Sequence, residues 1–498
     1  KKGEIIMRKK GLAIAMAVTL GLSAAAPTFA VNAAELPQDN VGVVQETTED
    51  TEQEDTETPV YEDIQQDVEK QQESKNTIEV QSEEQAENMV ELSETNFPDE
   101  VFRQYLKNFD TDGDGWIDAD GVESIDLNQY TTEVRSLQGI ERFSNLRYLD
   151  CSYNNLSTLD VSNNTALTQL YCYCNKLSTL DVSNNTALTR LTCDNNNLST
   201  LKLGNNTALT ELVCFKNNLS TLDVSNNTAL TKLDCYENNL STLKLGNNTA
   251  LTFLQCFDNN LSALDVSNNI ALTYLNCAQN NLSTLDVSNN TALTDLVCSY
   301  NNLSTLDVSN NTALTDLSCR NNNLSTLDVS KNTALKNLDY AENNLNTLDL
   351  SNNIALDWLE CSNNNLSTLD VSNNTALRWL ECSNNNLSTL DVSNNTALTR
   401  LQCDGNNLRT LDLRNNKNME MVDCSDNYIY KVDFSYLSPG VELTIDPQKP
   451  IETLEKINGK WCYTKYGDID TTATKLFKYN NKWYYVKNGV VDMKTTTL

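Results

Sequence analysis

The stretch LTRLTCDNNNLSTLKLGNNTA (Leu188–Ala208) returns, with small edits, through most of the chain. Each copy has 21 residues and divides into halves of ten and eleven residues. In most copies both halves follow the pattern L-x-x-L-x-(C or V)-x-x-N. The cysteines of the first half are 21 residues apart, except for one step of 42 in which Tyr340 fills the vacant slot. A fixed period of this length is typical of solenoids, and it predicts 14 rungs over residues 146–437.

The alternation of apolar and polar residues in each half predicts a short strand, and therefore two strands per turn. Successive turns should stack about 4.8 Å apart. Asparagines that follow the strands, such as Asn196 and Asn206, are expected to bond backbone groups at the turns. Cysteine takes an inward slot, where a free thiol behaves as a small hydrophobe, so we expect reduced, structural cysteines rather than disulfides. Cys174 and Cys462 lie outside the series and are expected to be exposed.

This pattern resembles the 21-residue class of bacterial leucine-rich repeats with nested ten- and eleven-residue halves, sometimes called IRREKO. The preceding segment SLQGIERFSNLRYLD (Ser136–Asp150) is similar to internalin-type repeats. The resemblance implies a parallel β-solenoid that binds proteins or glycans at bacterial surfaces. We therefore predict a mostly β protein, a leucine-rich-repeat solenoid with a small helical N-terminal cap and a C-terminal β-hairpin module.

The charge and composition of the chain exclude several classes of function. The formal net charge is -32, with 68 Asp and Glu against 36 Lys and Arg, and the chain has no histidine. A surface this acidic repels phosphate backbones, so no nucleic-acid partner is expected. Without an imidazole base the usual serine and cysteine triads are excluded, and we expect a protein that is not an enzyme. An extracellular carbohydrate-active enzyme is the most distant alternative.

The N-terminal segment MRKKGLAIAMAVTLGLSAAAPTFA (Met7–Ala30) has a basic run, a short apolar run and small residues. This order predicts a signal peptide over residues 1–34, with an uncleaved anchor as the alternative. Residues 35–93 are rich in Glu, Asp, Gln and Thr and predict a disordered acidic spacer. We expect a secreted protein that is associated with the cell surface and is not an integral membrane protein.

Residues 94–145 are expected to form the N-terminal cap, beginning with a short helix in NFPDEVFRQYLKNF. The next segment, DTDGDGWIDADG (Asp110–Gly121), resembles an EF-hand loop. That resemblance implies weak calcium binding that stiffens the cap, because the twelfth position is Gly121 where the family has a bidentate Glu. Asp120 or Glu123 could take its place, and an Asp-Gly turn without an ion is the alternative reading. The implied ligands are Asp110, Asp112, Asp114, the Trp116 carbonyl and Asp118.

The second half repeat barely varies, whereas outward positions of the first half vary strongly and include many aromatic residues. Constant positions suit a scaffold and varied, aromatic-rich positions suit recognition, so we predict two ligand-binding clusters. Aromatic residues chosen only for β-propensity are the alternative. The first cluster, expected to be one contiguous apolar patch, is Phe215, Tyr236, Phe253, Phe257 and Tyr274. The second is Trp358 and Trp379, flanked by Glu360 and Glu381.

The constant half carries an outward row of aspartates from Asp160 to Asp412, interrupted by Lys202 and Lys244. Like charges on adjacent strands cost stability, and the lysines should relieve that repulsion locally. We interpret the row as turn-forming residues, with a cation-binding stripe as the alternative.

Residues 438–498 contain NGKWCYTKYGDID and NNKWYYVKNGVVD, two units that each predict an aromatic β-hairpin. They are similar to the hairpin repeats of bacterial cell-wall and glucan-binding modules, and that similarity implies binding to wall or glycan; a plain cap is the rival interpretation. The implied residues are Trp461, Tyr463, Trp483, Tyr484 and Tyr485.

Together these features predict an adhesin-like binding protein for an extracellular protein or glycan. The second hypothesis is a wall-organising protein that binds glycans of its own envelope.

Overall fold

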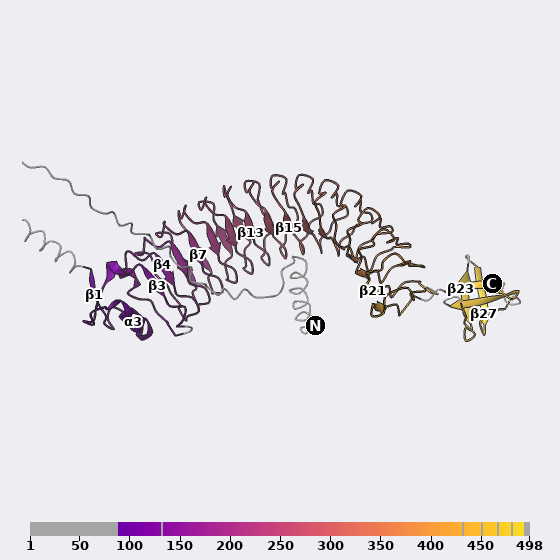
Figure 1. Cartoon of the computed structure of the whole chain (residues 1–498), viewed down its shortest axis with the longest axis horizontal. Helices are drawn as coiled ribbons and strands as arrows, with labels where there is room; N and C mark the ends of the chain where they lie inside the picture. The colour runs from indigo at the N-terminus through magenta and orange to yellow at the C-terminus, as the bar shows by residue number, and fades with distance from the viewer. Residues whose placement is uncertain are drawn as a thin grey trace, which may run out of the picture. The chain divides into compact units, whose positions relative to one another are not determined.

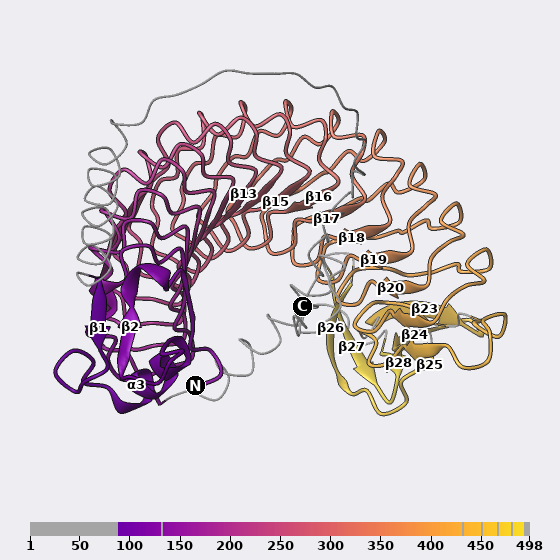
Figure 2. The same ribbon diagram turned by 60° about the vertical axis from the view of Figure 1, so that its left-hand side comes forward.

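The computed structural model describes residues 88–130, 133–430, 433–449, 452–465, 468–479 and 482–492. The predicted signal peptide lies outside these ranges, and so does the predicted spacer apart from its last six residues. The described repeats form a curved solenoid with one long sheet on its concave side (Figures 1 and 2). The predicted leucine-rich-repeat β-solenoid is therefore confirmed.

The long sheet has 16 parallel strands that follow one another in chain order. They are β3 (Ser124–Asp126), β4 (Tyr148–Asp150), β5 (Gln169–Tyr171), β7 (Arg190–Thr192), β9 (Glu211–Val213), β11 (Lys232–Asp234), β13 (Phe253–Gln255), β14 (Tyr274–Asn276), β15 (Asp295–Val297), β16 (Asp316–Ser318), β17 (Asn337–Asp339), β18 (Trp358–Glu360), β19 (Trp379–Glu381), β20 (Arg400–Gln402), β21 (Met421–Asp423) and β22 (Glu442–Thr444). The sheet thus runs one strand further at each end than the 14 predicted rungs.

Neighbouring strands pair without slippage, so each side chain lies beside the equivalent side chain of the next rung. Leu233, for example, is opposite Leu212 on one side and Leu254 on the other. The middle residue of each repeat strand points into the core, and the first and third point outward. This register turns every position of the repeat into a column along the solenoid.

Leucine, valine and cysteine columns fill the core. All fifteen cysteines are free thiols, and the thirteen of the regular series are fully buried, as predicted. Burial raises the pKa of these thiols, for instance that of Cys256, which keeps them protonated and unreactive. Tyr340 is also fully buried in the vacant cysteine slot. The prediction for Cys462 is wrong: only 3% of it is exposed, because it lies within the C-terminal sheet, whereas Cys174 is half-buried.

Asparagines of the first half repeat bond the rungs to one another. The Asn175 amide donates to the carbonyls of Cys151, Cys172 and Tyr173 at 2.9, 3.2 and 3.3 Å. Its oxygen accepts from the Leu156 N–H at 2.9 Å. The same four bonds recur at Asn196, so the predicted role of these residues is confirmed.

Asparagines of the second half repeat are bonded less completely. The Asn185 amide donates to the carbonyls of Val161 and Asn164, both at 2.8 Å. Its oxygen is buried and has no hydrogen-bond partner among the described residues. The same holds for Asn206. Its side chain therefore bonds backbone groups as a donor, as predicted, but not as an acceptor.

The convex side has fewer strands than the sequence predicts. The described strands there form two pairs, β6 (Thr179–Asp181) with β8 (Thr200–Lys202) and β10 (Thr221–Asp223) with β12 (Thr242–Lys244). We call these the close rung pairs. Elsewhere the second half repeat is described without a strand, so the prediction of two strands per turn is wrong for most rungs.

The second rung of each close pair reads LKLG where other rungs read LDVS. Gly204 has a φ of +58°, and a Cβ there would lie 2.7 Å from the Ser183 Cβ of the preceding rung. The missing Cβ therefore permits close approach, and the Val182 N–H donates to the Lys202 carbonyl at 2.9 Å. The Lys202 ammonium lies 3.0 Å from the Asp181 carboxylate. It therefore offsets the repulsion between aspartates on neighbouring rungs, as expected. Both pairs have this arrangement.

The N-terminal cap begins with β1 (Met89–Glu91), which pairs with β2 (Trp116–Asp118). The predicted helix is present as α3 (Glu100–Leu106), followed by the 3₁₀ helix η1 (Lys107–Phe109). Asp99 caps α3 by accepting from the Phe102 N–H at 3.0 Å. The other 3₁₀ helices of the cap are η2 (Ala119–Gly121) and η3 (Ile140–Arg142).

The C-terminal module is a separate antiparallel sheet with its own apolar cluster around Leu454, Tyr463 and Val486. Two hairpins flank β28 in the order β23-β24-β28-β27-β26, and β25 pairs with β24. Among the described residues, no helix has the length and hydropathy needed to cross a membrane. The strands are β23 (Glu452–Ile457), β24 (Lys460–Lys465), β25 (Asp468–Ile469), β26 (Lys475–Tyr479), β27 (Lys482–Lys487) and β28 (Val490–Val491).

Candidate ligand-binding surface

The concave sheet presents the first and third residue of each strand, together with the residue after each buried cysteine. Three of the predicted aromatic residues follow buried cysteines and stack in one column. The rings of Phe215 and Tyr236 are 4.3 Å apart and nearly parallel, and those of Tyr236 and Phe257 are 4.4 Å apart. The 21-residue period produces this stack, because it places equivalent side chains on adjacent strands.

Phe253 and Tyr274 form a second stack, with ring centroids 4.6 Å apart. They occupy the first positions of β13 and β14, opposite each other in register. The third strand positions, including Gln255 and Asn276, lie between the two stacks. The five predicted residues therefore share adjacent rungs but form two parallel stacks instead of one contiguous apolar patch. Stacking leaves each ring half-buried.

A network of ion pairs lies on the same face, on the rungs that carry Phe215 and Tyr236 and on the rung before them. The Arg190 guanidinium donates to Glu211 at 2.6 Å, and the Lys232 ammonium lies 3.1 Å from Glu211 and 3.2 Å from Asp234. Burial acts to raise the pKa of Glu211, but hydrogen bonds from Lys232 and Arg190 lower it overall. Sequence reasoning did not single out this network, although alternating charges at positions 190, 211 and 232 were its signal.

The second predicted cluster comes together as expected. Trp358 lies opposite Trp379, and Glu360 lies opposite Glu381, on β18 and β19. The Trp379 Nε1–H donates to Glu381 at 2.5 Å, and the Arg400 guanidinium lies 4.6 Å from the centre of the Trp379 ring. Both indoles are half-buried. They therefore present partly exposed rings beside carboxyl groups.

The Glu360 carboxyl is only 3% exposed. Burial, together with the hydrogen bond and the charge of Glu381, raises its pKa well above the usual range. Glu360 is therefore harder to ionise than an ordinary glutamate. Asp339, on the preceding strand β17, is opposite Glu360, and burial raises the pKa of Asp339 to about 6.

Carboxyl groups on β15 to β19 differ from those of the ion-pair network. Asp295 and Asp316 are opposite each other in register, and burial raises the pKa of Asp295. Of the described Lys and Arg residues, none forms an ion pair within 4.0 Å of the five carboxyl groups on these strands. The concave face therefore has one part with paired charges and aromatic stacks, on β7 to β14, and an acidic part with two tryptophans, on β15 to β19. The five groups are Asp295, Asp316, Asp339, Glu360 and Glu381.

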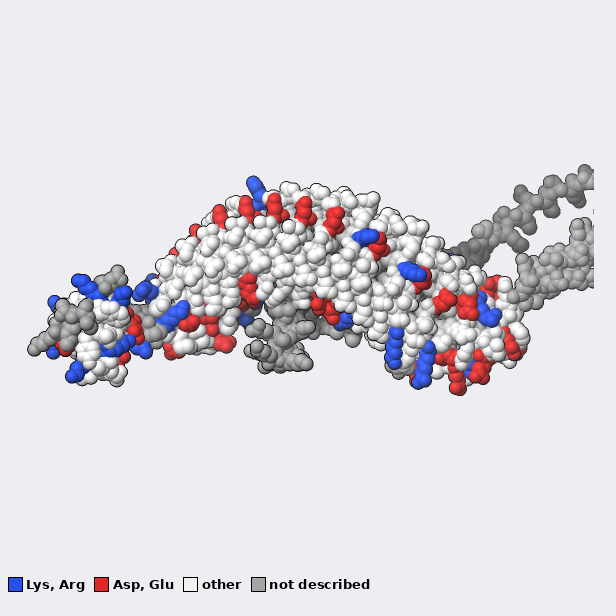
Figure 3. All heavy atoms as spheres, turned by 180° about the vertical axis from the view of Figure 1, so that it is seen from behind, with Lys and Arg blue, Asp and Glu red and all other residues white. Residues whose placement is uncertain are grey.

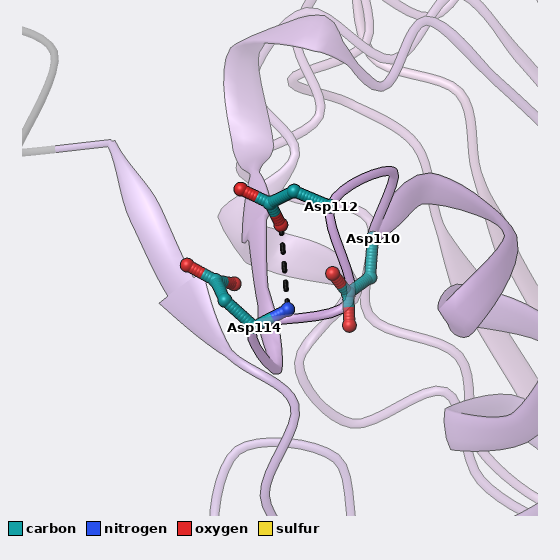
Figure 4. Close-up of side chains that lie close together, drawn as sticks. All are labelled: Asp110, Asp112 and Asp114. Atoms are coloured by element: carbon teal, nitrogen blue, oxygen red, sulfur yellow. Dashed lines mark hydrogen bonds between the residues drawn. The ribbon is translucent and has the colours of Figure 1, made fainter.

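The predicted calcium loop brings three of its four carboxylate ligands together (Figure 4). Ligand oxygens of Asp110, Asp112 and Asp114 all lie within 4.8 Å of one another. That spacing fits one Ca²⁺ with bonds of about 2.4 Å. The Asp118 carboxylate is not in the group and instead accepts from the Asp120 N–H at 3.1 Å.

Neither proposed substitute for the missing twelfth ligand joins the three carboxylates. Asp120 accepts from the Ser144 hydroxyl at 3.3 Å, and Glu123 lies 3.9 Å from Arg147. The segment after the loop is the three-residue helix η2 instead of a full exiting helix. The donor set suits calcium, but it lacks the bidentate group that strengthens an EF-hand.

The aromatic residues predicted to bind wall or glycan fall on two faces of the C-terminal sheet. Tyr463 is buried and packs with Tyr484 in the apolar cluster. Trp483 and Tyr485 alternate with Tyr484 along β27, so they point to the opposite face. Trp461 shares a face with Tyr463, two residues away on β24. The structure therefore separates Trp461 from Trp483, which sequence similarity between the two units had paired.

Aspartates of the convex row form turns. Asp307, for example, accepts from the Ser309 N–H at 2.9 Å, and hydrogen bonds from Ser309 lower its pKa. Acidic side chains are visible at regular intervals along the outer edge of the solenoid (Figure 3). Among the described residues, no three carboxylates of this row approach closely enough to share a metal ion. These contacts support the turn-forming interpretation.

No protein-family model and no curated protein gives a match to the chain. Among solved structures, it is similar to the functional domain of InlJ from Listeria monocytogenes, which includes a cysteine ladder. The two are 36% identical, with a TM-score of 0.64, over 70% of this chain and 78% of that one. The chain belongs to the internalin-type leucine-rich-repeat family.

More distant structures share only the fold with this internalin-type chain. A leucine-rich-repeat protein of Leptospira interrogans is 23% identical, with a TM-score of 0.51, over 63% of this chain and 81% of that one. The plant peptide hormone receptor RGFR1, solved in complex with RGF2, is 24% identical, with a TM-score of 0.53, over 58% of this chain and 53% of that one. A shared fold does not imply a shared partner, so the function of this chain must be argued from its surface.

Proposed function

We propose that this internalin-type protein is an exported, adhesin-like binding protein at the bacterial surface, whose concave face takes an extracellular protein or glycan. Its mechanism is recognition without chemistry, and we propose no enzymatic activity. The parallel sheet supplies a rigid support, and the outward columns supply side chains that differ from rung to rung.

One observation carries this proposal: the aromatic side chains gather in stacks on the concave face. Phe215, Tyr236 and Phe257 hold one another in place, and so do Phe253 and Tyr274. Half-buried, mutually supported rings lose little conformational freedom on binding, which makes them effective contact residues. The constant half repeat, by contrast, is occupied by turns and buried ladders.

The test uses the full chain and a panel of extracellular proteins and glycans, with affinity measured by surface plasmon resonance. Phe253→Ala and Trp358→Ala should each weaken binding about tenfold or more, because each removes a large contact ring. Ile354→Ala is the matched control. Ile354 is 62% exposed, belongs to the constant half repeat and is outside the strands of the concave sheet.

A ligand whose affinity is unchanged by both aromatic substitutions would refute the concave-face proposal. Equal weakening by Ile354→Ala would also contradict it, because the effect would then not belong to the concave surface.

A second candidate function is attachment to glycans of the protein's own envelope through the C-terminal module. The exposed Trp461 and Trp483 favour it, since aromatic rings of this kind stack on sugars. In that case wall affinity would reside in the module, and the solenoid would act as a spacer or scaffold.

We also propose that the cap loop binds calcium weakly through Asp110, Asp112 and Asp114. Calcium bound there would stabilise the junction of β1, β2 and the first strand of the solenoid. Isothermal titration of the full chain should give a dissociation constant of about 0.1–1 mM, as in extracellular modules. Asp112→Asn should abolish the heat of binding, whereas Asp307→Asn should leave it unchanged.

A further inference from the structure

Strands β15 to β19 present the five carboxyl groups described above on five successive strands of the concave sheet. The hydrogen bonds that these groups accept come from neutral donors. Asp339, for example, accepts from the Ser318 hydroxyl at 3.0 Å and from the Ala341 N–H at 3.2 Å. We call the five carboxyl groups, together with Trp358 and Trp379, the acidic concave face.

The charge of this face is not balanced by the basic residues of the same rungs. The concave segments of these rungs contain seven acidic and three basic residues. Arg320 pairs with Glu342, and Arg378 pairs with Asp357, which accounts for two residues of each sign. Lys336 is the remaining basic residue, against the five carboxyl groups of the face. The segments are residues 294–300, 315–321, 336–342, 357–363 and 378–384.

The earlier part of the same sheet supplies cations for its own carboxyl groups. Glu211 lies between Arg190 and Lys232, and Lys232 also pairs with Asp234. The fold can therefore place a cation on the strand next to a carboxyl group, but it does not do so for the five groups on β15 to β19. Like charges on adjacent strands are destabilising, so a ligand that brings positive charge to these strands would offset that cost.

The two tryptophans suit the same kind of ligand. The Arg400 guanidinium lies 4.6 Å from the centre of the Trp379 ring, so one indole already holds a cation of the chain itself. Trp358 is half-buried and lies opposite Trp379, and none of the described Lys and Arg residues lies over its ring. Indole attracts ammonium and guanidinium groups more strongly than other aromatic side chains do. Trp358 and the carboxyl groups beside it therefore offer both parts of a site for basic side chains.

The dimensions of the face suit an extended chain segment better than a single ion. Five strands about 4.8 Å apart place the outermost carboxyl groups roughly 19 Å apart, which is the length of about six extended residues. Among the described residues, no three carboxyl groups of this face bring oxygens within 4.8 Å of one another, as one metal ion would require. A segment with several basic residues would meet these groups one after another.

We propose that the acidic concave face binds a basic, extended segment of an extracellular protein. Lys and Arg side chains of that segment would pair with the carboxyl groups of β15 to β19, and one would lie over the Trp358 ring. The inference rests on the proposed function and deepens it, because it assigns a partner chemistry to one part of the concave face. An anionic segment would be repelled there.

The experiment measures binding of the full chain to a synthetic peptide of alternating Lys and Ser by surface plasmon resonance. The peptide should bind about tenfold or more tightly than the same peptide with Gln in place of Lys, and its affinity should fall with increasing salt concentration. The double variant Asp316→Asn/Glu381→Gln should weaken binding about tenfold, and Trp358→Ala about fivefold. Both carboxyl groups are half-buried, and both replacements keep an oxygen acceptor for the neutral donors of the parent.

The matched control is the double variant Asp286→Asn/Asp328→Asn. It removes the same amount of charge from rungs β14 and β16, but from exposed aspartates of the convex row. Binding of the Lys peptide should change less than about twofold in this control, because the replaced groups are outside the concave face. Equal losses in the two double variants would show attraction to the net charge of the chain and would overturn the proposal.

Further outcomes decide the occupant. Failure of the Lys peptide to bind more tightly than the Gln peptide would overturn the proposal. Spermine or a chitosan oligomer that binds while the Lys peptide does not would overturn the protein source. A ligand from the panel of the proposed function that depends on Phe253 but binds the Asp316→Asn/Glu381→Gln variant normally would overturn this inference and leave the proposed function standing. Circular dichroism of each variant confirms that the solenoid remains folded.

Discussion

At the scale of single residues, the two asparagine ladders differ in how completely their amides are bonded. Asn175 makes four hydrogen bonds to backbone groups, whereas Asn185 makes two. Asn175→Ala should therefore lower the free energy of unfolding by about 2–3 kcal/mol and Asn185→Ala by about half as much, because each leaves buried carbonyls unbonded. Urea unfolding of both variants checks this, and equal losses would contradict it.

Asp339 makes stability depend on pH. Burial raises its pKa in the folded protein to about 6, against 3.8 for an ordinary aspartate. Between these values the folded state binds more protons than the unfolded state, so stability falls as pH rises from about 4 to 6. Asp339→Asn, which keeps the acceptor for the Ala341 N–H, should be more stable than the parent at pH 7 by about 3 kcal/mol and similar at pH 4.

Melting temperatures across this pH range test the assignment. Asp307→Asn is the control, because the pKa of Asp307 is lowered and its contribution has the opposite sign. A parent and an Asp339→Asn variant with parallel pH profiles would show that Asp339 does not titrate as assigned.

The reactivity of each cysteine thiol toward Ellman's reagent should depend on how deeply the thiol is buried. Only Cys174 is half-buried, whereas every cysteine of the regular series is fully buried and Cys462 is 3% exposed. We expect about one thiol to react in the native protein and the remainder only after unfolding. Cys174→Ala should remove the native reaction, and a fast reaction that persists would contradict the buried ladder.

At the scale of elements, the close rung pairs depend on two residues that depart from the repeat. Gly204→Ser would place a Cβ 2.7 Å from Ser183, and Lys202→Asp would place like charges opposite each other. The first should cost about 1–2 kcal/mol and the second about 1 kcal/mol in urea unfolding. Lys331→Asp, outside this strand column, should cost less. Equal effects would show that the close approach does not stabilise the fold.

These pairs also show where sequence reasoning succeeds and fails. The concave strands, buried cysteines and first asparagine ladder followed from period and alternation, because each depends on one repeat and its neighbour. The convex strands did not, because their pairing depends on how closely two rungs approach. Gly204 and Lys202 signal that approach in the sequence, but a consensus taken over all the repeats does not contain them.

The same limit applies to the candidate sites. Tryptophans at positions 358 and 379 come together because they are 21 residues apart within a regular array. Trp461 and Trp483 are equivalent in sequence but separate, because the two hairpins contribute opposite faces to the C-terminal apolar cluster. Sequence similarity cannot reveal which face a strand buries when each face carries aromatic residues.

At the scale of the whole molecule, charge should make stability depend on salt. From Asp265 to Asp412 the convex row has one aspartate per rung, without an intervening lysine in the same column. Raising the NaCl concentration from about 10 to 500 mM should therefore raise the melting temperature, because salt screens exposed charges. Asp286→Lys, Asp328→Lys and Asp370→Lys together should reduce that dependence, and an unchanged salt slope would contradict it.

The close rung pairs would also shape the response to mechanical tension. Hydrogen bonds between rungs run along the solenoid, so a pull on the two ends would open rungs one at a time. Each ordinary rung would release 21 residues, or about 70 Å of extended chain. A close pair has paired strands on both its concave and convex sides, so its two rungs would resist separation together and yield a longer step at higher force. The glycine and lysine of LKLG would thus set the points at which an extending solenoid pauses.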